Sequence, residues 1–141
     1  MRKTVIVVAV VALAFALATP VVFRPKTGEI GTFSIEGSYW YDKIEWYRDN
    51  TEFAQEVEAR SSDYEFSRPI MTADKAIDAA LEVWLPIYGQ ESIARQRPYN
   101  AFYDANSEMW LIYGTLHTNV GGTAGILIQT DGTIMAVWHE R

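Results

Sequence analysis

The sequence contains no cysteine in its 141 residues. A chain without thiols forms no disulfide, builds no thiolate metal site, and has neither a cysteine nucleophile nor a lipid-modified cysteine. Histidine is scarce too, since only His117 and His139 are present. A metal site needs three or four converging ligands, and neither an HExxH pattern nor a calcium-loop pattern occurs. The sequence therefore predicts no metal site and calls for no cofactor.

The few histidines also narrow the routes to catalysis. No GxSxG motif marks a nucleophilic serine, so general acid–base chemistry is what remains. It would pair His117 with Asp104, or His139 with Asp131, because an aspartate can orient an imidazole that titrates near neutrality. Polar residues at strand ends more often face water. We expect a non-enzymatic protein, and the alternative is a small ligand-binding or enzymatic domain in which one such pair converges in a pocket.

Positive charge is in the minority, with 12 lysines and arginines against 18 aspartates and glutamates and a formal net charge of −6. An acidic surface repels a phosphate backbone, which disfavours nucleic acid as a partner. The same charge would speed encounter with a basic protein, or it would serve only to keep the domain soluble.

Residues 1–23 are typical of a targeting segment. Arg2 and Lys3 precede an apolar run of 19 residues from Val5 to Phe23, and Ala16–Ala18 fits a small-x-small cleavage site. Two interpretations stay open: a cleaved signal peptide, or an uncleaved anchor that holds the protein on the membrane. A buried core helix fits the basic start less well. Both favoured readings predict an exported protein, periplasmic or anchored in the inner membrane and facing outward.

The remaining chain divides by its pattern. Residues 24–37 hold three glycines and a proline and are expected to form a linker, so that residues 38–141 form a single domain. Helical spacing predicts two short helices within 39–60, the second capped by Asn50 or Thr51. A longer amphipathic helix is expected from Thr72, its N-cap, to a terminating Gly89.

Strand periodicity follows Pro98. Four short apolar runs are separated by turn residues, and their sequences are YNAFYDA, EMWLIYGTLH, TAGILIQ and TIMAVWH. Asp131-Gly132 lies between the last two runs and is a strong hairpin signal. The order predicts an α+β fold, in which helices pack on a curved four-stranded antiparallel meander.

The predicted strands are apolar on both faces. Trp110 and Ile112 alternate with Leu111, and simple alternation puts Ile134 and Val137 on opposite faces. The helix from Thr72 covers only one face of such a sheet. The other face must be covered by the helices within 39–60, curl into a cone, or meet a partner.

Five aromatic residues crowd into the acidic segment that precedes the long helix: Trp40, Tyr41, Trp46, Tyr47 and Phe53. Tryptophan and tyrosine are favoured anchors of protein interfaces, which makes these the candidate partner-binding residues. They would serve equally to cover the open face of the sheet.

The glycine pair Gly121-Gly122 has the composition of a phosphate-binding loop but not its context. A dinucleotide loop leads from a strand into a helix, whereas GGTAG leads into the strand ILIQ. A bend where a strand begins is the better interpretation.

Several short pieces in residues 70–141 together suggest a family. In chain order they are Pro86, Tyr88 and Gly89; Pro98 and Tyr99; Trp110 and Gly114; Gly121 and Gly122; and Asp131 and Gly132. With these pieces the C-terminal half resembles the immunity proteins that have a nuclear transport factor 2-like fold. The resemblance implies a cone-shaped (cystatin-like) α+β domain. All the pieces are turn and strand positions, so the resemblance carries over no residue that contacts a partner.

The resemblance also implies a function, which is to bind and neutralise a cognate bacterial toxin. Combined with the acidic charge, it predicts a non-enzymatic binding module whose partner is a protein, a basic toxin encoded nearby. Besides the enzymatic alternative, a structural protein of the cell envelope remains a third interpretation.

Overall fold

The computed structural model describes residues 27–141. The predicted signal peptide or anchor over residues 1–23 lies outside the described residues. Within the described part, no helix is both long enough and apolar enough to cross a membrane.

Helices and strands follow one another largely as the sequence predicts, and the fold is α+β. The elements are β1 (Thr27–Thr32), α1 (Tyr39–Asp49), α2 (Thr51–Arg60), a 3₁₀ turn (Ser61–Asp63), α3 (Ala73–Tyr88), α4 (Gln90–Ala94), β2 (Tyr99–Asp104), β3 (Met109–Tyr113), β4 (Ala124–Gln129) and β5 (Ile134–His139).

The sheet corrects two of the predictions. It has five strands rather than four, in the order β1-β2-β3-β4-β5, and it is mixed because β1 pairs with β2 in parallel. The antiparallel meander is limited to β2–β5. The added strand comes from the segment predicted as a linker, residues 24–37.

The glycines of residues 24–37, which suggested a linker, serve instead to pack a strand. A Cβ on Gly31 would lie 2.9 Å from the ring of Phe102, and one on Gly28 would lie 2.6 Å from the side-chain oxygen of Asn100. These two glycines let β1 approach β2 closely, a use of glycine in strands that composition alone does not separate from a flexible linker.

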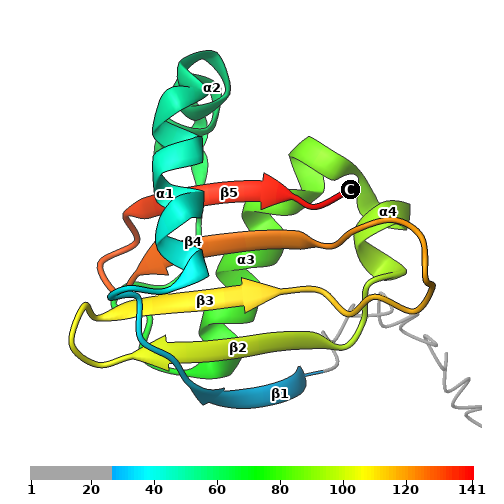
Figure 1. Cartoon of the computed structure of the whole chain (residues 1–141). Helices are drawn as coiled ribbons and strands as arrows, with labels where there is room; N and C mark the ends of the chain where they lie inside the picture. Colours follow the sequence, from blue (N-terminus) through cyan, green and yellow to red (C-terminus); the bar gives the residue numbers. More distant parts are fainter. Residues whose placement is uncertain (1–26) are drawn as a thin grey trace, which may run out of the picture.

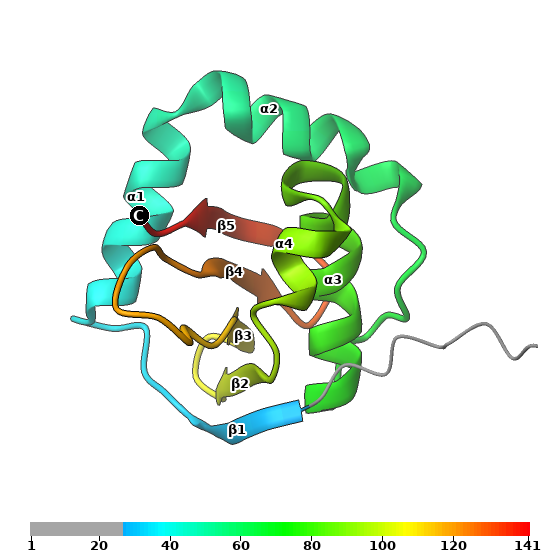
Figure 2. The same ribbon diagram turned by 90° about the vertical axis from the view of Figure 1, so that its right-hand side faces the viewer.

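The helices lie on both sides of the sheet. α3 covers one face, and α1 crosses the other (Figure 1). Turned by 90°, the structure shows α2 passing beyond the β5 edge from the α1 side to the α3 side (Figure 2). We call residues 39–60, which form α1 and α2, the α1–α2 arm.

α3 begins and ends as its sequence predicts. The hydroxyl oxygen of Thr72 accepts a hydrogen bond from the backbone N–H of Lys75 (3.3 Å), and Gly89 follows the helix with a φ of 84°. Asn50 occupies the N-cap position of α2, as predicted, but its side chain makes no capping hydrogen bond there. Its amide donates instead to the carbonyl of Trp46 (2.8 Å) and so completes the end of α1.

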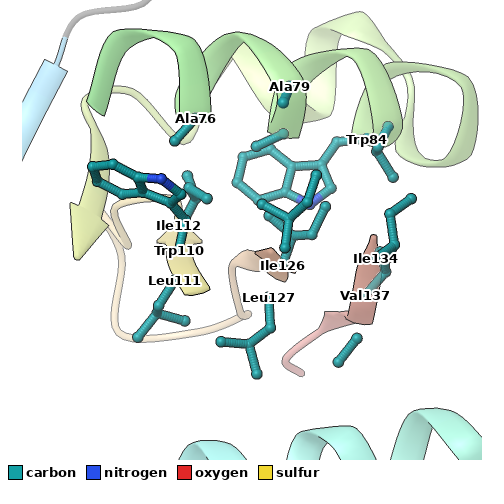
Figure 3. Packing of buried hydrophobic residues seen from close by; sticks show 14 of the residues in the cluster. Ala76, Ala79, Trp84, Trp110, Leu111, Ile112, Ile126, Leu127, Ile134 and Val137 are labelled. Carbon is teal, nitrogen blue, oxygen red and sulfur yellow. The ribbon is translucent and has the colours of Figure 1, made fainter. Parts of the chain in front are cut away.

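Buried side chains of the sheet pack against α3 on one face (Figure 3). Its two tryptophans are buried with their polar atoms satisfied. The indole N–H of Trp84 donates to the carbonyl of Gly125 (3.3 Å), and that of Trp110 donates to the carbonyl of Ile70 (2.9 Å). These bonds remove the penalty of burying an indole N–H, so the core keeps the full apolar area of both rings.

The opposite face is covered from within the chain, as the first of the three alternatives predicts. Leu111 and Leu127 point away from α3 (Figure 3). On this side Ile44 and Tyr47 of α1 are buried, with 3% and 2% of their surfaces exposed. The α1–α2 arm is therefore part of the core and not an appendage.

The prediction that Ile134 and Val137 lie on opposite faces of the sheet was wrong, because β5 is irregular. Its pairing with β4 shifts between Leu127 and Ile128, so that Ile134 lies opposite Ile128 and Val137 lies opposite Ile126. Ile126 and Ile128 share a face, and cross-strand partners lie on the same side of a sheet. Ile134 and Val137 consequently share the α3 face, although simple alternation separates them.

Asp104 ties the connection between β1 and α1 to the sheet. Its buried carboxylate accepts a hydrogen bond from the backbone N–H of Ile35 (3.1 Å). It also accepts from the N–H of Asn106 (3.0 Å) and the hydroxyl of Ser107 (2.8 Å). Burial alone would raise the pKa of Asp104, but these hydrogen bonds outweigh it and hold the pKa below its usual value.

We expect the Asp104→Ala variant to lose about 2 kcal/mol of unfolding free energy at neutral pH, because the N–H of Ile35 is left without its acceptor. A folded pKa below the unfolded value means that the carboxylate stabilises the protein above about pH 4. This contribution disappears as the pH falls through the folded pKa. Urea denaturation at neutral pH and near pH 3 measures both effects.

The exposed Asp63→Ala variant is the matched control and should change little at either pH. Equal losses for the Asp104→Ala variant at both pH values would contradict the assignment.

Candidate functional site

The five aromatic residues predicted to bind a partner differ in how much of their surface is exposed. Tyr47 is buried, and its ring meets that of Phe53 edge-on at 6.0 Å. Tyr41 and Trp46 remain 46% and 45% exposed. Trp40 is half-buried against the sheet. Tyr47 and Trp40 thus help to cover the open face of the sheet, whereas Tyr41 and Trp46 keep much of their surface in solvent.

Trp40 belongs to an aromatic row laid over the open face of the sheet. Its ring stacks on Tyr113 of β3 (5.9 Å between centroids, 17° between planes) and meets Trp138 of β5 at 6.0 Å. Tyr113 in turn stacks on Phe102 of β2 (5.7 Å, 3°). The row fixes the start of α1 over three strands.

Beside this row, a charged cluster joins α1 to the end of β5. The ammonium group of Lys43 lies 4.9 Å from the ring centre of Tyr39 and 5.5 Å from that of Trp138. It is also 3.3 Å from the carboxylate of Glu140, which accepts a further hydrogen bond from the Tyr39 hydroxyl (2.9 Å).

The pKa of Lys43 reflects this setting. Burial acts to lower the pKa, but the hydrogen bonds to Tyr39 and Glu140 and the attraction of Glu140 raise it overall above its ordinary value. Sequence reasoning missed this cluster. The i,i+4 spacing of Tyr39 and Lys43 is a signal, whereas Glu140 lies 101 residues from Tyr39 and reaches it only through the fold.

Two hollows open beside these aromatic residues. The first, which we call the aromatic hollow, has a volume of about 560 Å³ and lies between Trp40, Tyr113, Trp138 and Glu29, with the loop after β3 at its rim. The second, of about 820 Å³, is lined by Tyr39, Lys43 and Trp46. Trp138 and Glu140 line both.

Gly125 makes this arrangement possible. It lies opposite Trp138 in the β4–β5 ladder, and a Cβ on Gly125 would be 2.3 Å from the indole. The glycine therefore lets the indole lie flat across β4. In that position the ring meets that of Trp40, and the Lys43 ammonium lies over it.

The motif residues near the end of β3 serve packing. The side-chain oxygen of the buried Gln96 accepts from the N–H of Ala124 (2.7 Å), and a Cβ on Gly114 would lie 2.5 Å from that oxygen. The Tyr99 hydroxyl donates to the carbonyl of Ile93 (2.7 Å). Pro98, directly before Tyr99, leads from α4 into β2.

The other motif residues lie at turns and helix ends. Gly121 has a φ of 102°, and Gly122 has no room for a Cβ against the backbone of Glu140. Gly132 has a φ of 91° in the tight turn before β5, where Asp131 accepts from the N–H of Thr133 (2.8 Å). Near the end of α3, Pro86 is exposed, whereas the ring of Tyr88 lies 5.2 Å from that of His139.

The two acid–base pairs proposed from sequence are not brought together. Asp104 lies opposite Met109 at the start of β3, whereas His117 comes after the end of that strand. Asp131 precedes β5, and His139 ends it. Each strand extends by about 3.3 Å per residue, so both pairs lie beyond hydrogen-bonding reach. Among residues 27–141, no three His, Asp or Glu side chains are grouped to hold a metal ion.

Residues 75–141 match the family model of the NTF2 fold immunity proteins. The match confirms the resemblance stated for the C-terminal half. It takes in nearly all of α3, together with α4 and β2–β5, and leaves out β1 and the α1–α2 arm. No curated protein and no solved structure matches the chain. The matched segment holds Tyr113, Trp138 and Glu140, so it supplies one wall of the site, and β1 and the arm supply the other.

We expect Gly125→Ala to displace the Trp138 indole, because the added methyl group occupies its place. The variant should lose about 2 kcal/mol of unfolding free energy, a usual cost of overpacking. Near-UV circular dichroism reports the tryptophan environment, and chemical denaturation reports the stability.

Gly121→Ala separates backbone strain from the clash. A Cβ on Gly121 meets nothing within 4 Å, although its φ is positive. This variant should lose stability and keep the near-UV spectrum, and an unchanged spectrum for Gly125→Ala would refute the placement of Trp138.

Proposed function

We propose that this protein is an immunity protein that binds a bacterial protein toxin and blocks it by covering a surface the toxin needs. The observation that carries the proposal is the match of residues 75–141 to the NTF2 fold immunity proteins. The family supplies the general role of toxin neutralisation, and the surface of this chain supplies the rest of the argument.

The α1–α2 arm has the composition of a surface that recognises a basic protein. Over residues 39–60 the chain carries six aspartates and glutamates against three lysines and arginines. Tyr41 and Trp46 are exposed among these charges. Exposed aromatic rings supply most of the binding energy at many interfaces, while complementary charge speeds association and selects the partner.

The position of the arm supports the same assignment. The arm lies outside the segment matched by the family model, and yet it is packed firmly through Ile44 and Tyr47. A binding surface that is rigid before association loses less conformational entropy on binding. We assign specificity for one toxin to the arm and the supporting scaffold to the matched segment.

The site of action that we propose is outside the cytoplasm. This proposal is supported by the apolar run from Val5 to Phe23 and the preceding Arg2 and Lys3, in the sequence. The mass of the mature N-terminus distinguishes a cleaved signal from a retained anchor.

The proposed function is tested by expressing the product of the adjacent open reading frame with and without this protein. We expect that product to arrest growth of the host and co-expression to restore it. A neighbouring product that is harmless, or toxicity that co-expression leaves unchanged, would defeat the proposal.

The binding surface is tested with Trp46→Ala. We expect the dissociation constant of the toxin complex to rise at least about tenfold, as for an interface hot spot. Affinity should also fall as salt is raised, because screening weakens the attraction between acidic and basic surfaces. Calorimetry or surface plasmon resonance measures both.

Met71→Ala is the matched control, since Met71 is 62% exposed and lies outside the arm, just before α3. It should bind as the wild type does. If the two variants lose affinity equally, the arm is not the contact surface.

A further inference from the structure

We propose that the aromatic hollow receives an arginine side chain of the protein partner. The inference rests on the proposed function, in which that partner is a basic toxin. It goes further in assigning a particular site and a particular chemical group, a guanidinium, to a hollow whose residues come from β1, α1, β3 and β5.

The walls of the hollow are aromatic rings of the kind that attract cations. Trp40 and Tyr113 are nearly parallel, with 17° between their planes, and Trp138 completes the wall at 6.0 Å from Trp40. The face of an aromatic ring carries partial negative charge, and tryptophan is the strongest of the aromatic residues in binding a cation. Trp40 and Tyr113 are half-buried, so part of each ring borders the hollow, whereas Trp138 is buried and contributes to the lining only.

Glu29 supplies the carboxylate. Its backbone N–H is held by the side-chain oxygen of Asn100 (2.9 Å), which fixes the residue at the rim. Burial raises the pKa of the Tyr113 hydroxyl, and the negative charge of Glu29 raises it further. Glu29 and Tyr113 both line the hollow, so one ligand placed there can meet the carboxylate and the ring. Within residues 27–141, none of the salt bridges involves Glu29.

In the neighbouring charged cluster, a cation of the chain itself binds to ring faces and a carboxylate. There the Lys43 ammonium lies over the rings of Tyr39 and Trp138 and against the carboxylate of Glu140. The aromatic hollow repeats the combination of ring faces and a carboxylate, with Trp138 shared between the two. Among the described residues, no lysine or arginine forms a salt bridge with Glu29, the carboxylate of the aromatic hollow.

The shape of the hollow favours arginine over lysine. A planar guanidinium stacks on flat rings and presents a fork of N–H donors to a carboxylate, whereas an ammonium acts as a strongly hydrated point charge. The volume of about 560 Å³ lies within the range of clefts that bind ligands. Arg141 also lines the hollow, so its own guanidinium is the competitor to be tested.

The experiment titrates the full-length protein with N-acetylarginine amide and follows the indole N–H signals of Trp40 and Trp138 by NMR. We expect saturable shifts with a millimolar dissociation constant, and none with the citrulline analogue, which has the same shape without the charge. Glu29→Gln should weaken binding about threefold, as expected for an exposed charge pair. Glu36→Gln removes an exposed carboxylate outside the hollow and should leave binding unchanged.

Two results would overturn the inference. One is equal binding of the arginine and citrulline compounds, which shows that charge is not recognised. The other is binding that occurs only in Arg141→Ala, which shows that the hollow is filled by the chain itself. The titration contains no toxin, so its outcome is independent of the co-expression experiment, and the failure of either is recognised separately.

Discussion

The sheet has apolar side chains on both faces, and each face must be removed from water. A single helix covers one face only, so the fold needs α3 on one side and the α1–α2 arm on the other. The arm is bound to the sheet by its own apolar residues, Ile44 and Tyr47, and by the stacking of Trp40 on Tyr113. The site described above exists because this second face is closed by a helix that is both aromatic and acidic.

Because α1 covers the face of the sheet opposite α3, its two sides have different surroundings. Its inner side packs against β5, while its outer side keeps Tyr41 and Trp46 exposed among carboxylates. The segment that matches the NTF2 fold immunity proteins contributes Tyr113, Trp138 and Glu140 to the same region. The region is thereby built jointly by the matched segment and by an arm that lies outside the match.

Several glycines of the C-terminal segment are required by packing and not by chemistry. Gly114 and Gly125 each make room for a larger side chain, Gln96 in one case and Trp138 in the other. Gly121 and Gly122 have neither the helix nor the position that phosphate binding needs. The pieces that carry the family resemblance therefore report the shape of the domain.

The sequence by itself determined what depends on neighbours along the chain: the helices within 39–60, the helix from Thr72 to Gly89, the four C-terminal strands and the hairpin at Asp131-Gly132. Local periodicity, capping and turn chemistry suffice for these elements. Only the tertiary structure decided that residues 27–32 form a parallel fifth strand, that Ile134 and Val137 share a face, and that Glu140 meets Tyr39 and Lys43. Each of these depends on which segments meet in space, and the free energy that selects the pairing comes from burial and close approach between residues far apart in sequence, which no local pattern records.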